Sequence, residues 1–351
     1  MKAVRWHGRR DVRLDDVQDA PPPRAGEIRI DVLWCGICGT DLKEYRSGPI
    51  VIPTEPHPLT GLSAPVILGH EVSGRVTDIG EGVDDLHEGD LVALDGLIYC
   101  GSCPACRRHE VNRCERLASI GFSYHGGLAE RMTVPASMAI AAPATVQADS
   151  LALAEPFSVA VRALRRGRLQ PGDRVLVFGA GTIGLAVVQV AKALGAESVM
   201  VCEPIAFRRE LAVSIGATAA AEPERIRELV ARGSRGPDIV VECTGSATVP
   251  ELASELVRSG GRVVLVGVFT EAGPLSFLGL VLREIELIGS VSHIYDEDFL
   301  NAVELISSEK VDALRLVTHR VPLADAVHKG IHALGGPDVG SVVKILVSPE
   351  I

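Results

Sequence analysis

The sequence lacks an apolar run that could cross a membrane. Its longest charge-free apolar stretch, from Val175 to Ala191, is interrupted by three glycines and a glutamine, and a strand, a turn and a helix explain it better. The N-terminal residues MKAVRWHGRRDVRLDD also lack the apolar core and small-residue cleavage site of a secretory signal. We therefore expect a cytoplasmic protein without membrane contact.

Positive charge is also scarce. The 351 residues include 35 Lys and Arg against 45 Asp and Glu, which gives a formal net charge of −10. Such a surface repels phosphate backbones, so we expect no nucleic-acid partner. Repeats and low-complexity tracts are absent, and 47% of the residues are hydrophobic, which predicts a globular protein. The length exceeds that of one ordinary core and predicts two domains.

The hydrophobic pattern changes along the chain. Residues 1 to about 152 show short β-type runs between Gly/Pro turns, whereas from about 153 to 290 strands alternate with helices. That alternation predicts a doubly wound parallel sheet, so the expected fold class is α/β with a mainly-β first domain. After about 290 come two helical runs and a final β run, SVVKILVS, which match neither half decisively. This tail could return to the first domain.

Four of the eight cysteines stand in CGSCPACRRHEVNRC, at a C-x2-C-x2-C-x7-C spacing: Cys100, Cys103, Cys106 and Cys114. Short gaps let successive thiolates turn onto one ion, and four sulfurs complete a tetrahedral shell, which predicts a structural zinc. Arg107, Arg108 and Arg113 could offset the excess negative charge. The alternatives are four unrelated thiols or an iron–sulfur cluster.

A second metal site is suggested by dispersed residues. Cys35 and Cys38 form another C-x2-C in WCGICGTD, His70 and Glu71 lie in GHEVSG, and Glu155 begins the α/β half. A catalytic zinc needs three protein ligands and one open position. On the residues alone, a loop histidine and a carboxylate at a helix start explain His70 and Glu155 equally well.

A glycine-rich turn follows the strand-like run RVLVF and opens a helical period. Its residues are Gly179, Gly181, Thr182, Ile183 and Gly184, and Glu203 closes the next strand. This context predicts a dinucleotide site, with the pyrophosphate at the helix N-terminus and the acid on the adenosine ribose; a purely structural turn is the alternative. Glu203 favours NAD over NADP, although Arg208 and Arg209 temper that preference. Thr244 and Val268 are also expected to contact the cofactor.

These three motifs, in this order, resemble the zinc-dependent medium-chain alcohol dehydrogenases over essentially the whole chain. WCGICGTDLKEYRSGPIVIP, HPLTGLSAPVILGHEVSG and Glu155-Pro156 are most similar to 2,3-butanediol dehydrogenases, with sorbitol and threonine dehydrogenases as relatives. The resemblance implies a GroES-like catalytic domain of residues 1–152 with 291–351, a structural zinc lobe at about 96–116, and a Rossmann NAD-binding domain of 153–290.

The resemblance also implies the catalytic residues. Cys38, His70 and Glu155 would bind a second zinc, and Glu71 could be a transient ligand. Cys35 would then be a bystander. Two zinc ions and one NAD per chain are expected.

Three residues near Cys38 match family positions. Asp41 would orient His70, and Thr40 would take the proton of the substrate. Lys43 stands where many members have a histidine that passes this proton to solvent. A lysine relays only if its pKa is depressed; otherwise water or the cofactor ribose carries the proton.

The expected activity is hydride transfer between NAD and a secondary alcohol, a vicinal diol such as 2,3-butanediol giving its acetoin-type ketone. A polyol, L-threonine or a specialised biosynthetic alcohol is the alternative substrate. A non-catalytic zinc and dinucleotide-binding protein is the alternative of a different class. Family members are dimers or tetramers, so we expect a homo-oligomer, and the apolar runs GRVVLVGVF and LSFLGLVL are compatible with that.

Overall fold

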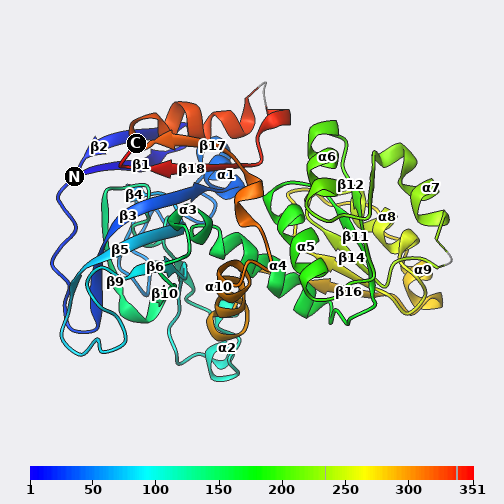
Figure 1. The fold of residues 1–351 in the computed structure, drawn as a ribbon, viewed down its shortest axis with the longest axis horizontal. Helices are drawn as coiled ribbons and strands as arrows, with labels where there is room; N and C mark the ends of the chain where they lie inside the picture. The colour runs from blue at the N-terminus through cyan, green and yellow to red at the C-terminus, as the bar shows by residue number, and fades with distance from the viewer. Residues whose placement is uncertain (234, 337–338) are drawn as a thin grey trace. The chain divides into compact units, whose positions relative to one another are not determined.

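The computed structural model describes residues 1–233, 235–336 and 339–351 (Figure 1). These residues form two compact units. The first comprises Met1–Glu155, Ile294–Ser307 and Val317–Ile351, and the second comprises Pro156–His293 and Ser308–Leu316. Within the described ranges, no helix combines the length and the apolar character needed to span a bilayer.

The first unit is built mainly from antiparallel strands. A seven-stranded sheet has the order β10-β6-β5-β3-β18-β17, and β9 pairs with β3 beside it. A three-stranded sheet, β2-β1-β4, and the pair β7-β8 complete the set. The strands are β1 (Lys2–Gly8), β2 (Asp11–Asp16), β3 (Glu27–Ile37), β4 (Val66–Ile67), β5 (Glu71–Ile79), β6 (Leu91–Leu94), β7 (Leu97–Ile98), β8 (Ala118–Ser119), β9 (Arg131–Pro135), β10 (Ala139–Ala141), β17 (Val317–Pro322) and β18 (Lys344–Ser348).

Short helices connect these strands. The α-helices are α1 (Gly39–Ser47), α2 (Pro104–Arg107), α3 (Ala148–Leu151) and α10 (Leu300–Ser307). The 3-10 and π segments are η1 (Val111–Arg113), η2 (Ala136–Met138), η4 (Tyr295–Phe299), η6 (Leu323–Asp325), η7 (Ala326–Ile331), η8 (Ala333–Gly335) and η9 (Val339–Ser341). The tail run LADAVHKGIHALG is therefore helical as predicted, but in 3-10 and π form.

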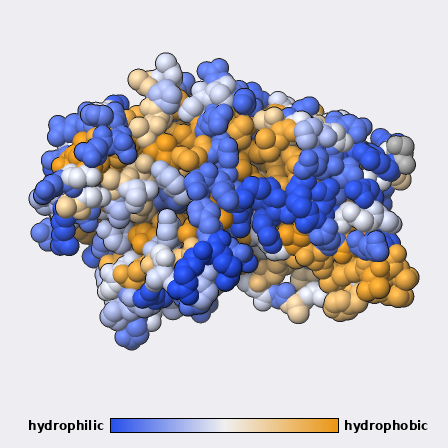
Figure 2. Space-filling view, turned by 90° about the horizontal axis from the view of Figure 1, so that it is seen from below, coloured by the Kyte–Doolittle hydropathy of each residue, from blue (hydrophilic) through white to orange (hydrophobic). Residues whose placement is uncertain are grey.

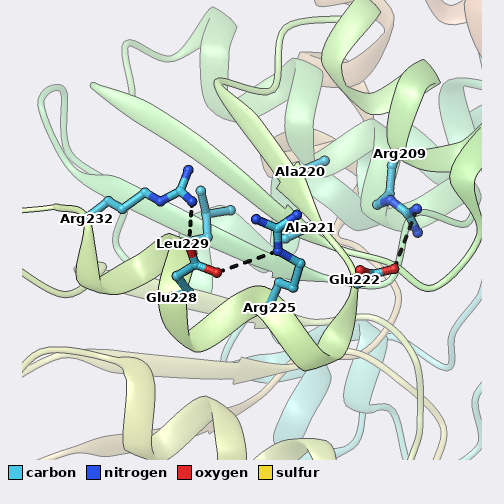
Figure 3. Close-up of a pocket in the computed structure, with 8 residues that line it drawn as sticks. All are labelled: Arg209, Ala220, Ala221, Glu222, Arg225, Glu228, Leu229 and Arg232. Carbon is cyan, nitrogen blue, oxygen red and sulfur yellow. Dashed lines mark hydrogen bonds and ion pairs between the residues drawn. The ribbon is translucent and has the colours of Figure 1, made fainter.

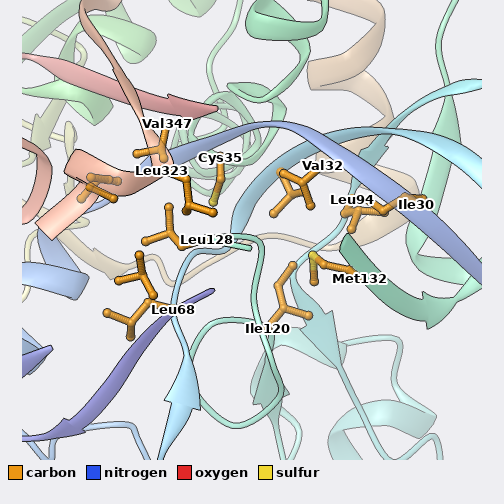
Figure 4. Close-up of a cluster of buried hydrophobic side chains, with 14 of the residues drawn as sticks. Ile30, Val32, Cys35, Leu68, Leu94, Ile120, Leu128, Met132, Leu323 and Val347 are labelled. Carbon is orange, nitrogen blue, oxygen red and sulfur yellow. The ribbon is translucent and has the colours of Figure 1, made fainter. Parts of the chain in front are cut away.

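The long strand β3 anchors the core of this unit. Its residues alternate between the interior and the edge of the core, with Ile28, Ile30 and Val32 buried, as a strand with period two requires. Figure 4 shows side chains from β3, β6, β9 and β18 converging on this core. The C-terminal strand β18 pairs with β3 and with β17, so the tail supplies an inner strand and an edge strand of the sheet.

The second unit contains a parallel sheet of the order β13-β12-β11-β14-β15-β16. In chain order this is 3-2-1-4-5-6, the order of a Rossmann fold, and the predicted fold class is confirmed for this unit. Its strands are β11 (Arg174–Phe178), β12 (Ser198–Cys202), β13 (Ala219–Ala221), β14 (Ile239–Glu242), β15 (Arg262–Leu265) and β16 (Glu286–Gly289).

Helices lie on both sides of this sheet, and in Figure 1 α5 and α8 are on opposite sides of its strands. The central strands β11 and β14 are therefore buried on both faces and read as continuous apolar runs. The helices are α4 (Ala154–Arg166), α5 (Thr182–Ala193), α6 (Ala206–Ser214), α7 (Ile226–Ala231), α8 (Val249–Leu256) and α9 (Phe277–Leu282), with η3 (Pro223–Arg225) and η5 (Ala313–Leu316).

Residues 308–316 lie in the second unit, whereas the sequence-based boundaries assign them to the first domain. Paired hydrogen bonds to α5 hold this segment. Gln189 Nε2 donates to the carbonyl oxygen of Asp312 (2.9 Å), and the Asp312 N–H donates to Gln189 Oε1 (2.6 Å). The buried polar side chain of Gln189 is satisfied in this way, which a sequence pattern does not reveal.

Candidate active site and metal centres

Cys38 lies at the N-terminus of α1, directly after β3 ends. It is the N-cap residue of the helix, and its backbone N–H donates to Asp41 Oδ2 (2.8 Å). This bond to the third helical residue resembles half of a capping box and fixes the turn that presents the sulfur. Cys38 Sγ lies 3.7 Å from Thr40 Oγ1. The local sequence CGTD therefore places a thiol, a hydroxyl and a carboxylate within one helical turn.

His70 and Glu71 approach this turn from the start of β5. One ligand atom each from Cys38, His70 and Glu71 lies within 4.8 Å of the others. The His70 ring packs against Phe122 at a centroid distance of 4.8 Å, which orients the imidazole. The structure thus brings together three groups that are separated along the chain.

Asp41 faces His70, as the resemblance implies. Its Oδ1 lies 3.9 Å from His70 Nδ1, which is longer than a hydrogen bond, and neither atom has a hydrogen-bond partner. Burial lowers the pKa of His70, but the hydrogen bond and charge of Cys38, with Asp41, outweigh it and raise the pKa to about 10. The site is thus electronegative and suited to a cation.

Glu155 and Lys43 lie near this group. Glu155 is in the first turn of α4, and its negative charge contributes to the raised pKa of His70, but Glu71 rather than Glu155 completes the set of ligand atoms within 4.8 Å. Lys43 is half-buried on α1, three residues after Thr40. Residues three apart on a helix are neighbours, so Lys43 lies along the same helix side as Thr40.

The four-cysteine motif forms a second cluster. Ligand atoms of all four residues lie within 4.8 Å of one another. Backbone N–H groups point at the sulfurs: Cys103 N donates to Cys100 Sγ (3.3 Å), and Cys100 N donates to Cys114 Sγ (3.3 Å). The N–H groups of Ser102 and Cys103 lower the pKa of Cys100 to about 5, which favours the thiolate that a metal requires.

The arginines around this cluster are arranged differently from the expectation. Arg108 and Arg113 both contact Glu110, and Arg107 donates to the carbonyl oxygen of Ser102. Arg116, which the sequence reasoning did not single out, instead lies beside Cys100, and the hydrogen bond and negative charge of this sulfur raise the pKa of the guanidinium. Its position two residues after the last cysteine was the available signal.

The predicted cofactor residues gather at the carboxyl ends of the parallel strands. Gly179, directly after β11, has a φ of 90°, which an L side chain rarely adopts, and a Cβ there would lie 2.9 Å from Thr244 Cγ2. A Cβ on Gly184 would lie 1.8 Å from the carbonyl oxygen of Gly179. A Cβ on Gly245 would lie 2.6 Å from the carbonyl oxygen of Val268. The loops after β11, β14 and β15 therefore meet at one edge of the sheet.

The Glu203 carboxylate holds the glycine-rich loop. Glu203 Oε2 accepts from Ala180 N (2.7 Å), and Oε1 accepts from Ile205 N (3.0 Å). The loop opens α5, whose N-cap residue is Gly181. Thr182 and Ile183 form the first turn of that helix.

A cavity of about 220 Å³ lies between β13 and α7. Figure 3 shows the residues that line it. Its three arginines contact carboxylates: Arg209 lies 4.0 Å from Glu222, and Arg225 and Arg232 contact Glu228. Arg209 Nη1 also donates to the carbonyl oxygen of Glu203 (2.9 Å). These cations are already compensated. Arg208, the neighbouring candidate, is on α6.

Comparison with known proteins decides the family. Residues 24–144 match the alcohol dehydrogenase GroES-like domain, and residues 182–308 match the zinc-binding dehydrogenase domain. The (R,R)-butanediol dehydrogenase of Bacillus subtilis is 34% identical over the full length of both chains. The chain belongs to the zinc-dependent medium-chain alcohol dehydrogenase family. The GroES-like and Rossmann expectations are both confirmed, and the protein is an oxidoreductase.

Solved structures of this dehydrogenase family agree. The crystal structure of 2R,3R-butanediol dehydrogenase from Bacillus subtilis matches with a TM-score of 0.92 and covers 99% of each chain at 34% identity. A zinc-binding dehydrogenase from Sinorhizobium meliloti, solved with NADP, matches at 0.89, with 30% identity and 99% of each chain. An Escherichia coli protein described as a short chain alcohol dehydrogenase, complexed with NADH, matches at 0.88, with 28% identity and 99% of each chain.

One buried residue of this dehydrogenase escaped the sequence reasoning. Lys344 Nζ lies 2.6 and 2.7 Å from the two carboxylate oxygens of Glu71, and it also donates to the carbonyl oxygen of Ile37 (3.0 Å). Both side chains are almost fully buried. The available signal was a lysine inside the apolar run SVVKILVS, because a charged residue is rarely buried unless it is paired.

Proposed function

We propose that this dehydrogenase interconverts a vicinal diol of the 2,3-butanediol type and its α-hydroxyketone, with NAD as the hydride acceptor. The observation that carries the proposal is the Cys38, His70 and Glu71 cluster beside the Thr40 hydroxyl, in a chain that matches a butanediol dehydrogenase over its whole length.

Two zinc ions per chain are part of the proposal. Thiolate, imidazole and carboxylate are the ligands that zinc prefers, and one ligand atom each from Cys38, His70 and Glu71 lies within 4.8 Å of the others. Cys38 and His70 would hold the catalytic ion, with Glu155 or Glu71 as third ligand. Cys100, Cys103, Cys106 and Cys114 would hold the structural ion. Zinc, when bound, supplies a Lewis acid that favours loss of the alcohol proton.

The residues of α1 would handle this proton. The Thr40 hydroxyl can accept it from the substrate and donate its own onward. Lys43, three residues further along the same side of the helix, is the candidate for the outer end of the relay if its pKa is depressed; otherwise water or the cofactor ribose carries the proton. Asp41 would orient His70. Replacing Lys43 by histidine tests the relay, because an unchanged pH–rate profile would count against it.

The preference for NAD rests on charge. Glu203 is a buried carboxylate at the end of β12, where a Rossmann fold receives the adenosine ribose, and a carboxylate there repels a 2′-phosphate. The contacts of Arg209 with Glu222 and with the carbonyl oxygen of Glu203 leave that guanidinium poorly placed to compensate. We therefore propose that the loop from Gly179 to Gly184, with Arg208, Thr244 and Val268, binds NAD in preference to NADP.

We also propose a homodimer or homotetramer. Helix α9 exposes an apolar stripe on the second unit, visible as an orange area in Figure 2. Its side chains are 69–74% exposed: Phe277, Leu278, Val281 and Leu282. Strand β16, which follows this helix, is an edge of the parallel sheet. An exposed apolar patch beside an unpaired strand edge is typical of a subunit interface. The cytoplasmic location stays a prediction.

The test is NADH formation by purified, zinc-replete protein. NAD would be mixed with each 2,3-butanediol stereoisomer, sorbitol, L-threonine and a simple secondary alcohol at matched concentrations. We expect one butanediol stereoisomer to give the highest kcat/KM. Cys38→Ser should abolish turnover, and Cys202→Ser, a change at a buried strand cysteine, should retain it. NAD binding without turnover of any alcohol would instead support a non-catalytic zinc and dinucleotide-binding protein.

A further inference from the structure

The Glu71 carboxylate lies between the candidate metal ligands Cys38 and His70 and the ammonium group of Lys344. One of its oxygens belongs to the group of ligand atoms with Cys38 and His70, yet both oxygens are within hydrogen-bond distance of Lys344 Nζ. A carboxylate offers about four lone pairs, so lysine and a metal ion can compete for it or share it. How strongly Glu71 binds a metal therefore depends on how firmly Lys344 holds it.

Three neighbouring strands build this arrangement. Glu71 is in β5, Gly36 is its register partner in β3, and Lys344 begins β18 on the other side of β3. A Cβ on Gly36 would lie 1.8 Å from Glu71 Oε2. The absence of a side chain at this position lets the glutamate cross the central strand and reach the lysine. The Lys344 ammonium group also donates to the carbonyl oxygen of Ile37, which is in β3 next to Gly36.

Burial makes this pair sensitive to change. The side chains of Lys344 and Glu71 are 2% and 1% exposed, so neither charge can be compensated by water. Removing one partner of a buried pair leaves the other charge uncompensated, and a nearby cation is then its best remaining partner. Without Lys344, the Glu71 carboxylate would be driven toward the metal ion.

We propose that Lys344 is a positioning residue that restrains Glu71 beside the catalytic metal and keeps it from becoming a permanent ligand. This inference rests on the proposed metal site at Cys38 and His70. The restraint keeps a coordination position open for the substrate and leaves the local charge more positive, because the ammonium cancels the carboxylate. The C-terminal strand β18 thereby contributes to a site whose other residues lie on or beside β3, α1, β5 and α4.

The experiment compares Lys344→Met, Glu71→Gln and the double variant with the wild type, all as full chains with Zn²⁺ or Co²⁺ as the probe. Lys344→Gln, which keeps a donor, serves if Lys344→Met does not fold, and Lys344→Arg keeps the charge. Zinc affinity comes from competition with a chromophoric chelator. The visible spectrum of the Co²⁺ protein reports the coordination number, and the four-cysteine site cancels in difference spectra between variants.

We expect Lys344→Met to lower the melting temperature of the metal-free protein, because the Glu71 charge is left unpaired. Zinc should then raise that temperature more than it does for the wild type, and the zinc dissociation constant of the catalytic site should fall at least tenfold. The visible Co²⁺ absorption should weaken as an oxygen ligand is added. In the Glu71→Gln background, Lys344→Met should leave the Co²⁺ spectrum unchanged, and Lys344→Arg should preserve the wild-type spectrum.

The outcomes separate this inference from the proposed function. If the wild type binds two metals, Cys38→Ser loses one, and Lys344→Met still has the wild-type Co²⁺ spectrum and zinc affinity, the inference is overturned while the metal site stands. If Cys38→Ser binds as much metal as the wild type, the proposed metal site itself is wrong. A spectral change of equal size in the Glu71→Gln background would show that Lys344 acts without Glu71, which also overturns the inference.

Discussion

Replacing Gly181 by alanine separates the two roles that glycines play in the cofactor loop. A Cβ at position 181 would meet no other atom within 4 Å, whereas a Cβ at position 184 would lie 1.8 Å from the carbonyl oxygen of Gly179. Gly181 faces open space at the N-terminus of α5, whereas Gly184 packs directly against the backbone of Gly179. If the pyrophosphate of NAD approaches the N-terminus of α5, a methyl group at 181 obstructs only the cofactor.

The magnitudes follow from these contacts. The φ of Gly181 is −76°, which alanine adopts without strain, so Gly181→Ala should change the free energy of unfolding by less than about 1 kcal/mol. Gly184→Ala forces the loop apart and should cost about 1–3 kcal/mol, as overpacking does. For both variants we expect the dissociation constant of NADH to rise at least ~10-fold, which corresponds to about 1.4 kcal/mol.

NADH fluorescence titration and thermal unfolding of the same preparations measure the two quantities. Gly8→Ala is the matched control, because a Cβ at the end of β1 also meets no atom within 4 Å. Wild-type NADH affinity in Gly181→Ala would refute the placement of the pyrophosphate over this residue. A large loss of stability in Gly181→Ala would refute the interpretation of the position as open space.

Three further changes test other parts of the molecule. Cys103→Ser should reduce the zinc content by about one ion per chain and lower the melting temperature, because a structural site needs all four sulfurs; unchanged zinc by elemental analysis would contradict this. Burial raises the pKa of Asp238, but the Arg174 N–H and the Arg258 guanidinium outweigh it and hold the pKa below 3.8. Its contribution to stability is therefore present above about pH 4 and lost as the pH falls through the lowered pKa, and Asp238→Asn should flatten the acid dependence of the urea midpoint. Leu282→Glu should dissociate the oligomer in sedimentation velocity, and an unchanged sedimentation coefficient would exclude α9 from the interface.

Much of the fold could be predicted because its elements have strong local periods. The strands and helices from Arg174 to Leu265 alternate as the apolar pattern indicates, since a parallel sheet buries both faces of its strands and leaves continuous apolar runs. Residues 308–316 belong to the second compact unit, although the sequence-based boundary at 290 assigns them to the first domain. The two hydrogen bonds between Gln189 and Asp312 that hold this segment join residues 123 positions apart, and no local period encodes them.

In the candidate site, too, some features follow from local spacing and others depend on the tertiary structure. The four-cysteine cluster is close along the chain, so its spacing alone indicates a common ion. The Cys38 group depends on β3 and β5 lying side by side, and the residues alone left it undecided until the family resemblance was considered. Arg116 interacts with the Cys100 sulfur, whereas Arg108 and Arg113, between the ligands, contact Glu110, and Arg107 contacts the Ser102 carbonyl oxygen.

The sequence by itself determined the short-range features: the C-x2-C spacings, the glycine-rich turn after a strand, and the acid that closes the next strand. Each depends on a few neighbouring residues, whose chemistry and backbone freedom act locally. Only the tertiary structure decided that Lys344 meets Glu71, 273 positions earlier, across a glycine of the strand between them. Such a contact arises from strand order and register, which long-range packing sets.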